Sequence, residues 1–408
     1  MCGIVGYVGE KEAAPILLDA LKRLEYRGYD SAGIAVFNEK IACFKNEGEL
    51  EKLIKLVPKK LDGNIGIGHT RWATHGRPTT MNAHPHLDCT GRIAVVHNGI
   101  IENFFELREE LKKRGHKFTS ETDTEVLAHL IEENYKDDLA LALRSALSRV
   151  SGSYAIAVLC SFEPDKILVA RKDNPLILGI GEKENYVASD IPAILTYTRK
   201  MIFLDNGEMA AITGKDIKIT TLQGKDVQKG IQNITWDIKA AEKAGYEHFM
   251  LKEINEQPRV IMETIAGRIS EHEGKIILGE IGLSERVISS LERIIIVACG
   301  TSYHAGYLGK YLFSKFARMP VSIEVASEFR YSDPAIVEKT LVIGISQSGE
   351  TADTLAAIRE ARSRGCTTLA ISNVVGSSIT REVDGVLYIR AGPEIGVAAT
   401  KTFTSQLS

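Results

Sequence analysis

The sequence lacks paired cysteines, a marked excess of either charge and any long hydrophobic run, and each absence excludes a class of protein. The 6 cysteines are scattered without a CxxC pair, which argues against a disulfide framework and against a zinc cluster. The formal net charge is only -3, so no electrostatic feature favours nucleic acid as a partner. No window has the apolar length that spans a bilayer, and the N-terminus lacks the features of a signal peptide. We therefore expect a cytoplasmic protein that acts on small molecules, without membrane or nucleic-acid partners.

A nucleotide-binding P-loop of the form GxxxxGK[ST] is also absent, so a nucleoside triphosphate is not indicated as a ligand. What is present is the composition of an ordinary globular protein, with 44% hydrophobic and 25% charged residues. A chain of 408 residues is too long for one hydrophobic core. Two to three domains are the natural expectation for such a length.

The first part of the chain, residues 1–221, alternates short β-rich runs with a few helical patterns. Apolar spacing predicts helices over residues 13–24, 101–114, 124–134 and 139–150. Each helix is amphipathic, as a helix that covers a sheet should be. We therefore predict a layered α+β domain over residues 1–221. The polar and charged stretch that follows it, residues 222–247, is predicted to be a linker.

The second part, residues 248–408, changes to a rhythm of strand, turn, helix and strand from residue 293 onward. Near-continuous apolar strands followed by helices are typical of a parallel sheet covered on both faces. The sequence therefore predicts an α/β parallel-sheet domain. A helical pattern opens near residue 398 and reaches residue 408 without a stop signal, so we expect the C-terminus to be truncated.

Cys2 directly follows the initiator methionine. Its small side chain permits removal of the methionine, and the freed α-amine would then share one residue with the thiol. Because such an amine titrates at about 7.7 to 8.0, it can take the thiol proton at physiological pH. This arrangement predicts an N-terminal nucleophile. The alternative is an ordinary cysteine that opens the apolar strand at residues 2–8.

The segment HTRWATHG at residues 69–76 places polar side chains directly after a predicted strand, on a loop of the kind that carries sites. The Arg71 guanidinium can hold a carboxylate by two hydrogen bonds, although a surface salt bridge is the alternative. The histidines at positions 69, 75, 84 and 86 lack the cysteine or carboxylate complement of a metal site. We therefore expect no metal.

Two further segments of the first domain allow both a structural and a functional interpretation. The pair Asn98 and Gly99 ends an apolar strand and is typical of a turn, but its side-chain amide and backbone N–H could instead form an oxyanion hole. Downstream, Thr122 and Glu125 fit a helix capping box. The neighbouring Asp123 could also receive the ammonium group of an amino acid.

Two strand-to-helix loops of the second domain are rich in hydroxyl groups. The carboxyl end of a parallel sheet is where α/β proteins bind ligands, and hydroxyls, an amide and free N–H groups at a helix start suit a phosphate monoester. The alternative is simple capping of both helices by serine or threonine. The side chains concerned are Thr301, Ser302, Ser346, Gln347, Ser348 and Thr351.

Taken in order, these segments resemble a known family. Those of the first half are similar to class II glutamine amidotransferases, and those of the second half to a sugar isomerase (SIS) domain, as in the glutamine:fructose-6-phosphate aminotransferase family. The resemblance implies a four-layer αββα N-terminal-nucleophile hydrolase domain, followed by a flavodoxin-like or Rossmann-like SIS domain. The segments are residues 2–6, 27–33, 70–76, 82–86, 97–103 and 120–125, then 299–302, 326–331, 346–354 and 394–398.

The resemblance also implies roles for individual residues. Cys2 would attack the side-chain amide of glutamine while its own α-amine handles the proton. Arg71 would bind the α-carboxylate of glutamine, and Asp123 its α-ammonium group. Asn98 and Gly99 would stabilise the tetrahedral oxyanion. Hydrolysis of the acyl-enzyme would then release glutamate.

Three more residues match glutamine-site positions of the family. Trp72 would close over the site and gate a channel for ammonia. Thr74 and His84 match site positions of the family, which assigns them no individual role here. The substrates implied are L-glutamine and fructose 6-phosphate, with glucosamine 6-phosphate as the product and no cofactor. The family also implies a homodimer formed through the isomerase domains.

The chain departs from the family in two respects. It carries Ala399 where family members often have serine, and we expect the second SIS domain to be absent. That domain supplies the groups for amination and isomerisation of the sugar, so synthesis of glucosamine 6-phosphate within one such chain is in question. One alternative function is a regulatory protein that binds a sugar phosphate and carries a glutaminase domain. Another is a different class II amidotransferase, such as the one that acts on phosphoribosyl pyrophosphate, although its signature is absent.

Overall fold

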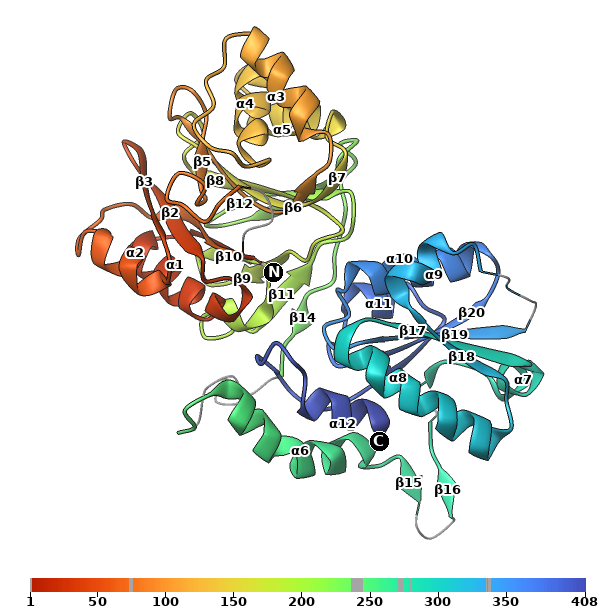
Figure 1. The fold of residues 1–408 in the computed structure, drawn as a ribbon. Coiled ribbons are helices and arrows are strands. Elements are labelled where there is room, and N and C mark those ends of the chain that lie inside the picture. The colour runs from red at the N-terminus through yellow and green to blue at the C-terminus, as the bar shows by residue number, and fades with distance from the viewer. Residues whose placement is uncertain are drawn as a thin grey trace. The chain divides into compact units, whose positions relative to one another are not determined.

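The computed structural model describes residues 2–72, 76–235, 245–270, 274–278, 281–334, 336 and 339–408. They fall into two compact units, Met1–Thr235 and Trp236–Ser408. In Figure 1 the first unit runs from red to green and the second from green to blue. Among the described residues, no helix has both the length and the apolar character needed to cross a membrane.

The first unit contains two antiparallel sheets. In order across the sheet, the eight-stranded sheet consists of β14 (Gln232–Asn233), β11 (Lys200–Phe203), β9 (Ile177–Ile180), β10 (Asn185–Ala188), β1 (Gly3–Val8), β4 (Ile65–Arg71), β2 (Ser31–Asn38) and β3 (Lys40–Glu47). In the same way, the six-stranded sheet consists of β13 (Ile217–Thr221), β12 (Glu208–Thr213), β8 (Lys166–Lys172), β7 (Gly152–Cys160), β6 (Ile93–Ile101) and β5 (His86–Leu87).

Helices cover the outer faces of both sheets. α1 (Ala13–Lys22) and α2 (Leu50–Leu56) contact the eight-stranded sheet. The six-stranded sheet is covered by α3 (Phe104–Lys113), α4 (Glu125–Asn134) and α5 (Leu139–Ser148). Because side chains alternate along a strand, the six-stranded sheet contributes to two cores, one shared with the other sheet and one with these helices. The four layers, helix, sheet, sheet and helix, confirm the predicted αββα fold.

The predicted helices of the first unit are found as α1, α3, α4 and α5, with ends that differ by a few residues. The stretch expected to be a linker, residues 222–247, includes β14, which pairs with β11 through Lys200 and Asn233. Gln232 and Asn233 of this stretch therefore belong to the eight-stranded sheet of the first unit.

The second unit contains a five-stranded parallel sheet of the predicted kind. Its strands lie in the order β18 (Val321–Val325), β17 (Arg293–Ala298), β19 (Thr340–Ser346), β20 (Thr367–Ser372) and β21 (Gly385–Tyr388). In chain order this is 2-1-3-4-5, the flavodoxin-like arrangement, whose topological switch point lies between the first and third strands. β17 and β19 are therefore the strands between which a ligand site is expected.

Helices cover both faces of this sheet. On one face Tyr303 of α8 (Gly300–Leu312) joins the apolar side chains of β17 and β19. The other face packs against α9 (Ala326–Tyr331), α10 (Ala352–Ser363) and α11 (Ser378–Arg381). The remaining elements are α6 (Phe249–Ile265), β15 (Ile269–Ser270), β16 (Lys275–Ile276), α7 (Glu285–Ser290), a π-helical turn (Phe313–Ala317) and α12 (Lys401–Leu407).

Candidate active site

A cavity of about 230 Å³ in the first unit brings together most of the residues predicted for glutamine chemistry. They come from the residue before β1, the end of β4 and the residue after it, the loop before β5, strand β6 and the segment before α4. Thr74, which was predicted to line the same site, lies outside the described residues. The predicted residues that line the cavity are Cys2, Arg71, Trp72, His84, Asn98, Gly99 and Asp123.

Cys2 lies directly before β1, whose next residue, Gly3, pairs with Thr70 of β4. This pairing brings the thiol to the chain that leaves β4. The Trp72 N–H donates to the Cys2 Sγ at 3.2 Å, and the Sγ lies 3.4 Å from the Trp72 carbonyl oxygen. Burial raises the pKa of the Cys2 thiol, although the Trp72 N–H and the Arg71 charge oppose this effect. The thiol therefore needs a base to become a nucleophile.

Asn98 is held with its amide group in a defined orientation. Its Oδ1 lies 2.9 Å from the His69 Nε2, and that nitrogen is also 3.1 Å from the His97 carbonyl oxygen. Because both neighbours are acceptors, we assign the imidazole proton to Nε2. The Asn98 Nδ2 is then the end that faces Cys2, and it donates to the Cys2 carbonyl oxygen at 3.0 Å. His69 thus aims an amide donor at the thiol-bearing residue.

Asn98 and Gly99 lie inside β6, so their interpretation as a turn is wrong. Gly99 pairs with Tyr154 of β7. Its φ of 132° lies in the region that favours glycine. A Cβ at this position would also lie 2.1 Å from the Ser153 carbonyl oxygen. The strand can therefore approach β7 this closely only with glycine at position 99.

Buried histidines form the wall behind Asn98. The rings of His69 and His84 stack with their centroids 4.1 Å apart, and the His84 Nδ1 accepts a hydrogen bond from the His97 N–H at 3.3 Å. Burial lowers the pKa of His69 to about 3 and that of His84 well below its usual value. Both rings are therefore neutral near pH 7.

Because His69 is buried in its neutral form, we expect the folded chain to lose stability at mildly acidic pH. Its pKa is about 6.5 in an unfolded chain and about 3 in the folded one. Between these two pH values the unfolded state binds more protons at this residue than the folded state does. The contribution of neutral His69 to the free energy of unfolding is therefore complete above pH 6.5 and is lost as the pH falls toward 3. At pH 5 we expect a loss of about 2 kcal/mol from this residue alone.

Urea unfolding at pH 7.5 and pH 5 checks this expectation. His69→Gln keeps a side-chain donor but cannot take the extra proton, so its unfolding free energy should fall less over this range than that of the parent chain. His248→Gln, at an exposed position, is the matched control and should behave like the parent. Equal pH dependence in the parent chain and His69→Gln would contradict the assignment.

Arg71 and Asp123 place opposite charges at the cavity. Both are at least nine-tenths buried. Arg71 is the last residue of β4. Its guanidinium donates to the carbonyl oxygens of Gly76 and Arg77, both at 3.4 Å. It also lies 4.0 Å from the Asp30 carboxylate. An Asp123 oxygen accepts the Ile101 N–H at 2.9 Å. An amino acid with both its charges could be bound by this pair.

The capping box predicted from Thr122 and Glu125 is wrong. α4 starts at Glu125 without any side-chain cap. The Glu125 carboxylate instead accepts the backbone N–H groups of Thr119 and Ser120, both at 2.7 Å. The Thr122 hydroxyl lies 3.0 Å from the Nε2 of His86. The carboxylate therefore bends the chain back before the helix and leaves Asp123 at the cavity.

Trp72 borders the cavity with a side chain that is 47% exposed. Its ring meets that of Tyr29 edge to face, with the centroids 5.3 Å apart. An aromatic side chain in this position can cover a bound ligand without a change of fold.

Arg27 is a residue of the site that the sequence did not single out. It lines the cavity, and its guanidinium donates to the Cys2 carbonyl oxygen at 3.0 Å. An ion pair with Asp190 at 2.7 Å fixes its direction, and the Tyr26 hydroxyl donates to the same carboxylate at 2.6 Å. The segment at residues 27–33 matched the family, but only the structure shows the contact to Cys2.

The hydroxyl-rich loops of the second unit follow β17 and β19, which are neighbours in the sheet. Both loops therefore lie at its switch point. The interpretation as simple capping is wrong, because the cap residues Cys299 and Thr351 make no side-chain cap hydrogen bond. The Ser346 hydroxyl instead accepts the Gly349 N–H and contacts Thr351, each at 3.0 Å.

The other side chains predicted for the sugar-phosphate site lie in the same two loops. The Ser348 hydroxyl accepts the Glu350 N–H at 3.1 Å, and Gln347 lies between these two serines. Thr301 and Ser302 lie in the first turn of α8. Ser302 is held from the C-terminal helix, because the Gln406 Nε2 donates to its Oγ at 3.1 Å.

Comparison with known proteins matches each half of the chain to a family. The glutamine amidotransferase domain family matches residues 59–265, and the SIS domain family matches residues 287–408. A structure described as the allosteric regulatory enzyme of purine biosynthesis is similar in fold, with a TM-score of 0.50 at 20% identity, covering 92% of this chain and 75% of that one.

Curated relatives match over the whole length of this chain. Glutamine–fructose-6-phosphate aminotransferase (isomerizing) of Methanosarcina acetivorans is 55% identical over 419 residues, which cover 100% of this chain and 68% of the relative. The protein of the same name from Caldanaerobacter subterraneus subsp. tengcongensis is 56% identical over 409 residues, covering 100% and 67%. This chain therefore belongs to the family of the isomerizing glutamine–fructose-6-phosphate aminotransferases.

Proposed function

We propose that the chain acts in the glutamine-dependent amination of fructose 6-phosphate. Cys2 hydrolyses glutamine to glutamate and ammonia, and the ammonia is used to convert fructose 6-phosphate to glucosamine 6-phosphate. The observation that carries this proposal is the cavity in which Cys2, Asn98, Arg71 and Asp123 meet. The family of the chain gives the sugar substrate, since its relatives are named for it.

The first chemical step belongs to Cys2. After removal of Met1, its α-amine takes the thiol proton, and the sulfur attacks the carbonyl carbon of the glutamine side chain. The negative charge that develops on the carbonyl oxygen is stabilised by the Asn98 Nδ2 and the Gly99 N–H. The ammonium group of Cys2 then returns its proton to the leaving nitrogen, which departs as ammonia. Water hydrolyses the thioester, releasing glutamate and the thiol.

Glutamine is oriented by the charged pair at the other side of the cavity. Arg71 binds the α-carboxylate through its planar guanidinium, and Asp123 accepts the α-ammonium group. Trp72 covers the bound substrate, and His84 lines the wall. Arg27 positions the reacting residue through its hydrogen bond to the Cys2 carbonyl oxygen.

Asp123→Asn tests this recognition. The substitution keeps an oxygen for the Ile101 N–H but removes the charge that pairs with the substrate ammonium. A charge-assisted hydrogen bond contributes about 1.5 to 3 kcal/mol, so KM for glutamine should rise roughly 10- to 100-fold, with kcat changed little. Steady-state glutaminase kinetics measure both. The exposed Asp62→Asn is the matched control, and an unchanged KM in Asp123→Asn would remove Asp123 from substrate binding.

The sugar phosphate binds at the switch point of the second unit. Its phosphate group accepts hydrogen bonds from the loop hydroxyls and N–H groups after β17 and β19, the Thr301–Ser302 and Ser346–Thr351 stretches. The side-chain amide of Gln347 is a further hydrogen-bond donor to the phosphate group. Position at the carboxyl edge of a parallel sheet supports this assignment.

The proposed function is tested by two assays on the same preparation. Calorimetry measures fructose 6-phosphate binding, and a product assay measures glucosamine 6-phosphate in the presence of glutamine. We expect binding that weakens about 10-fold or more in Ser348→Ala and stays unchanged in the exposed Ser363→Ala. Binding with glutamate release but no amino sugar would favour the alternative of a sugar-phosphate-binding regulatory protein. Absence of binding would contradict the sugar site.

We further propose that the protein is a cytoplasmic homodimer without nucleic-acid partners. The family resemblance supports the dimer, and the small net charge of -3 gives nucleic acid no electrostatic advantage. Light scattering coupled to gel filtration measures the oligomeric state.

A further inference from the structure

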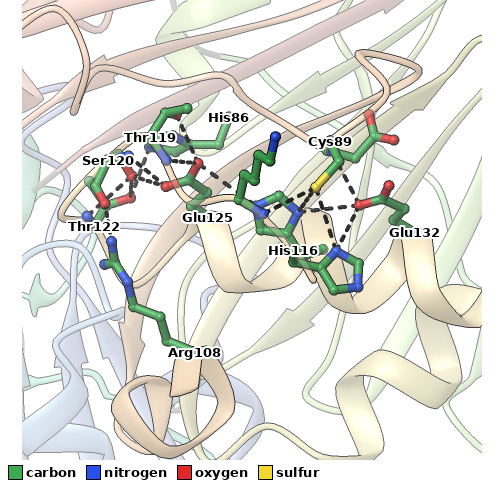
Figure 2. Close-up of polar contacts among 12 residues, drawn as sticks. His86, Cys89, Arg108, His116, Thr119, Ser120, Thr122, Glu125 and Glu132 are labelled. Atoms are coloured by element: carbon green, nitrogen blue, oxygen red, sulfur yellow. Dashed lines mark hydrogen bonds and ion pairs between the residues drawn. The ribbon is translucent and has the colours of Figure 1, made fainter. Parts of the chain in front are cut away.

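A second group of reactive side chains lies in the first unit, apart from the residues that line the glutamine cavity. It consists of Cys89, just after β5, His116, after α3, and His129 and Glu132, both in α4. One potential ligand atom from each lies within 4.8 Å of the others. Figure 2 shows Cys89, His116 and Glu132 converging on the same space. These four residues are named the CHHE cluster below.

Four of the six distances between the ligand atoms of the CHHE cluster are close to the edges of a tetrahedral metal site, and all six are within 4.8 Å. The Cys89 Sγ lies 3.7 Å from the His116 Nδ1 and 3.5 Å from the His129 Nδ1. The Glu132 Oε2 lies 3.1 Å and 3.2 Å from the same two nitrogens. Zinc bonds of about 2.3 Å to sulfur and about 2.0 to 2.1 Å to nitrogen or oxygen give tetrahedral edges of about 3.5 Å and 3.3 Å.

The two carboxylates around His129 favour positive charge there, which either a metal ion or a second imidazole proton supplies. Its Nδ1 faces the Glu132 carboxylate, and its Nε2 lies 3.8 Å from the Glu125 carboxylate. A neutral imidazole carries one proton, so one of its nitrogens would face a carboxylate acceptor without a hydrogen between them. A metal ion on Nδ1 leaves the proton on Nε2, where it points toward Glu125. In known sites a carboxylate that accepts this proton orients the histidine ligand; among the described residues, the His129 Nε2 is buried without a hydrogen-bond partner and lies 3.8 Å from Glu125.

Two backbone N–H groups add to the support around the cluster. The Lys117 N–H donates to the Cys89 Sγ at 3.4 Å, and the Cys89 N–H donates to the Glu132 Oε2 at 3.2 Å. Donors of this kind stabilise negative charge on the ligand atoms. His129 is buried, whereas Cys89 is exposed, so an ion has a path from solvent.

We propose that the CHHE cluster binds a divalent transition metal, with Zn²⁺ as the chemically best suited ion. The ligands are the Cys89 Sγ, the Nδ1 atoms of His116 and His129 and the Glu132 Oε2. Four protein ligands leave no open position, which is typical of a structural rather than a catalytic zinc site. The ion ties the loops after β5 and α3 to α4, the helix that begins just after Asp123.

This site differs from the metal interpretation considered for the sequence. That interpretation concerned the absence of a CxxC pair and the histidines 69, 75, 84 and 86, and it led us to expect no metal. In the CHHE cluster, Cys89 and His116 are 27 residues apart, and only His129 and Glu132 have a local spacing, three residues on one helix. A pattern so spread out is not visible before the fold is known.

Metal analysis of the full chain, prepared without a histidine tag or chelator from zinc-supplemented cells, tests the proposal. We expect about one zinc per chain in the parent protein. The zinc content should be lower by at least about 10-fold in Cys89→Ser and in Glu132→Gln, since each substitution removes one of the four ligands. Cys366→Ser, a cysteine substitution in the second unit, should keep its zinc. Chelation should lower the thermal unfolding midpoint of the parent chain but leave that of Cys89→Ser unchanged.

Cobalt substitution provides a spectroscopic readout that does not depend on catalytic activity. Co²⁺ bound to the metal-free parent chain should show thiolate charge-transfer absorption and the intense d–d bands of a tetrahedral ion, and Cys89→Ser should lack the charge-transfer band. The proposal is overturned if the parent chain binds neither ion at micromolar concentrations, or if Cys89→Ser and Glu132→Gln retain full metal content. Circular dichroism of Cys89→Ser checks that the exposed substitution leaves the fold intact.

Discussion

Replacing Cys2 with alanine should abolish glutamate release from glutamine, with a loss of roughly 10³-fold or more. The alanine has no sulfur to form the thioester, and no second thiol is among the residues that line the cavity. The charged pair that we propose to bind glutamine is untouched, so the substrate should still enter the site. A glutaminase assay that detects glutamate directly measures the effect.

The control for Cys2→Ala is a cysteine that lies in the second unit. Cys366→Ala should keep full glutaminase activity, and both variants should bind fructose 6-phosphate as the parent chain does. Retained sugar binding shows that the second unit is folded, and far-ultraviolet circular dichroism shows the same for the whole chain. Undiminished glutaminase activity in Cys2→Ala would exclude the nucleophile assignment.

Replacing Asn98 with alanine should lower kcat for glutamine hydrolysis by about 10²- to 10³-fold, equivalent to about 2.7 to 4 kcal/mol. The Asn98 Nδ2 is aimed at Cys2 by the contact between its Oδ1 and the His69 Nε2. The donor acts on charge that develops only in the transition state, so KM for glutamine should change little. Steady-state kinetics separate the two parameters.

Asn98→Asp refines this test, because aspartate keeps the acceptor for His69 but loses the amide donor. It should be at least as impaired as Asn98→Ala. Asn255→Ala, which removes a side-chain amide in the second unit, is the matched control and should retain activity. An Asn98→Ala enzyme with normal kcat and a raised KM would assign Asn98 to substrate binding instead.

Strong periodicity in the sequence predicted the elements that form the layers of the fold. α5, for example, buries residues 139, 142, 143, 146 and 147, which follow one face of a helix. β3 and α2 gave no such signal, because β3 is half-buried along most of its length and α2 has only seven residues. The interpretation of Asn98 and Gly99 as a turn was wrong for a different reason. Pairing with β7 overrides the local preference of the dipeptide.

The site was predictable to the extent that the family segments identify it. Seven of the residues named in advance line the cavity, and the structure adds Arg27, whose partner Asp190 lies 163 residues away. The CHHE cluster depends on contacts of the same long range. Neither the Arg27–Asp190 pair nor the cluster leaves a local pattern, because the members of each lie far apart in the sequence. Only the fold brings them together.

The central claim is that Cys2, as the first residue of the mature chain, is the nucleophile for glutamine. The most direct measurement is intact mass spectrometry with peptide mapping, after treatment with a glutamine analogue that carries a diazoketone in place of the amide. The thiol forms a thioether with this group as N₂ leaves. We predict a chain that lacks Met1 and carries a single adduct on Cys2, with glutamine protecting against labelling. A retained Met1, or an adduct on another residue with Cys2 unmodified, would contradict the claim.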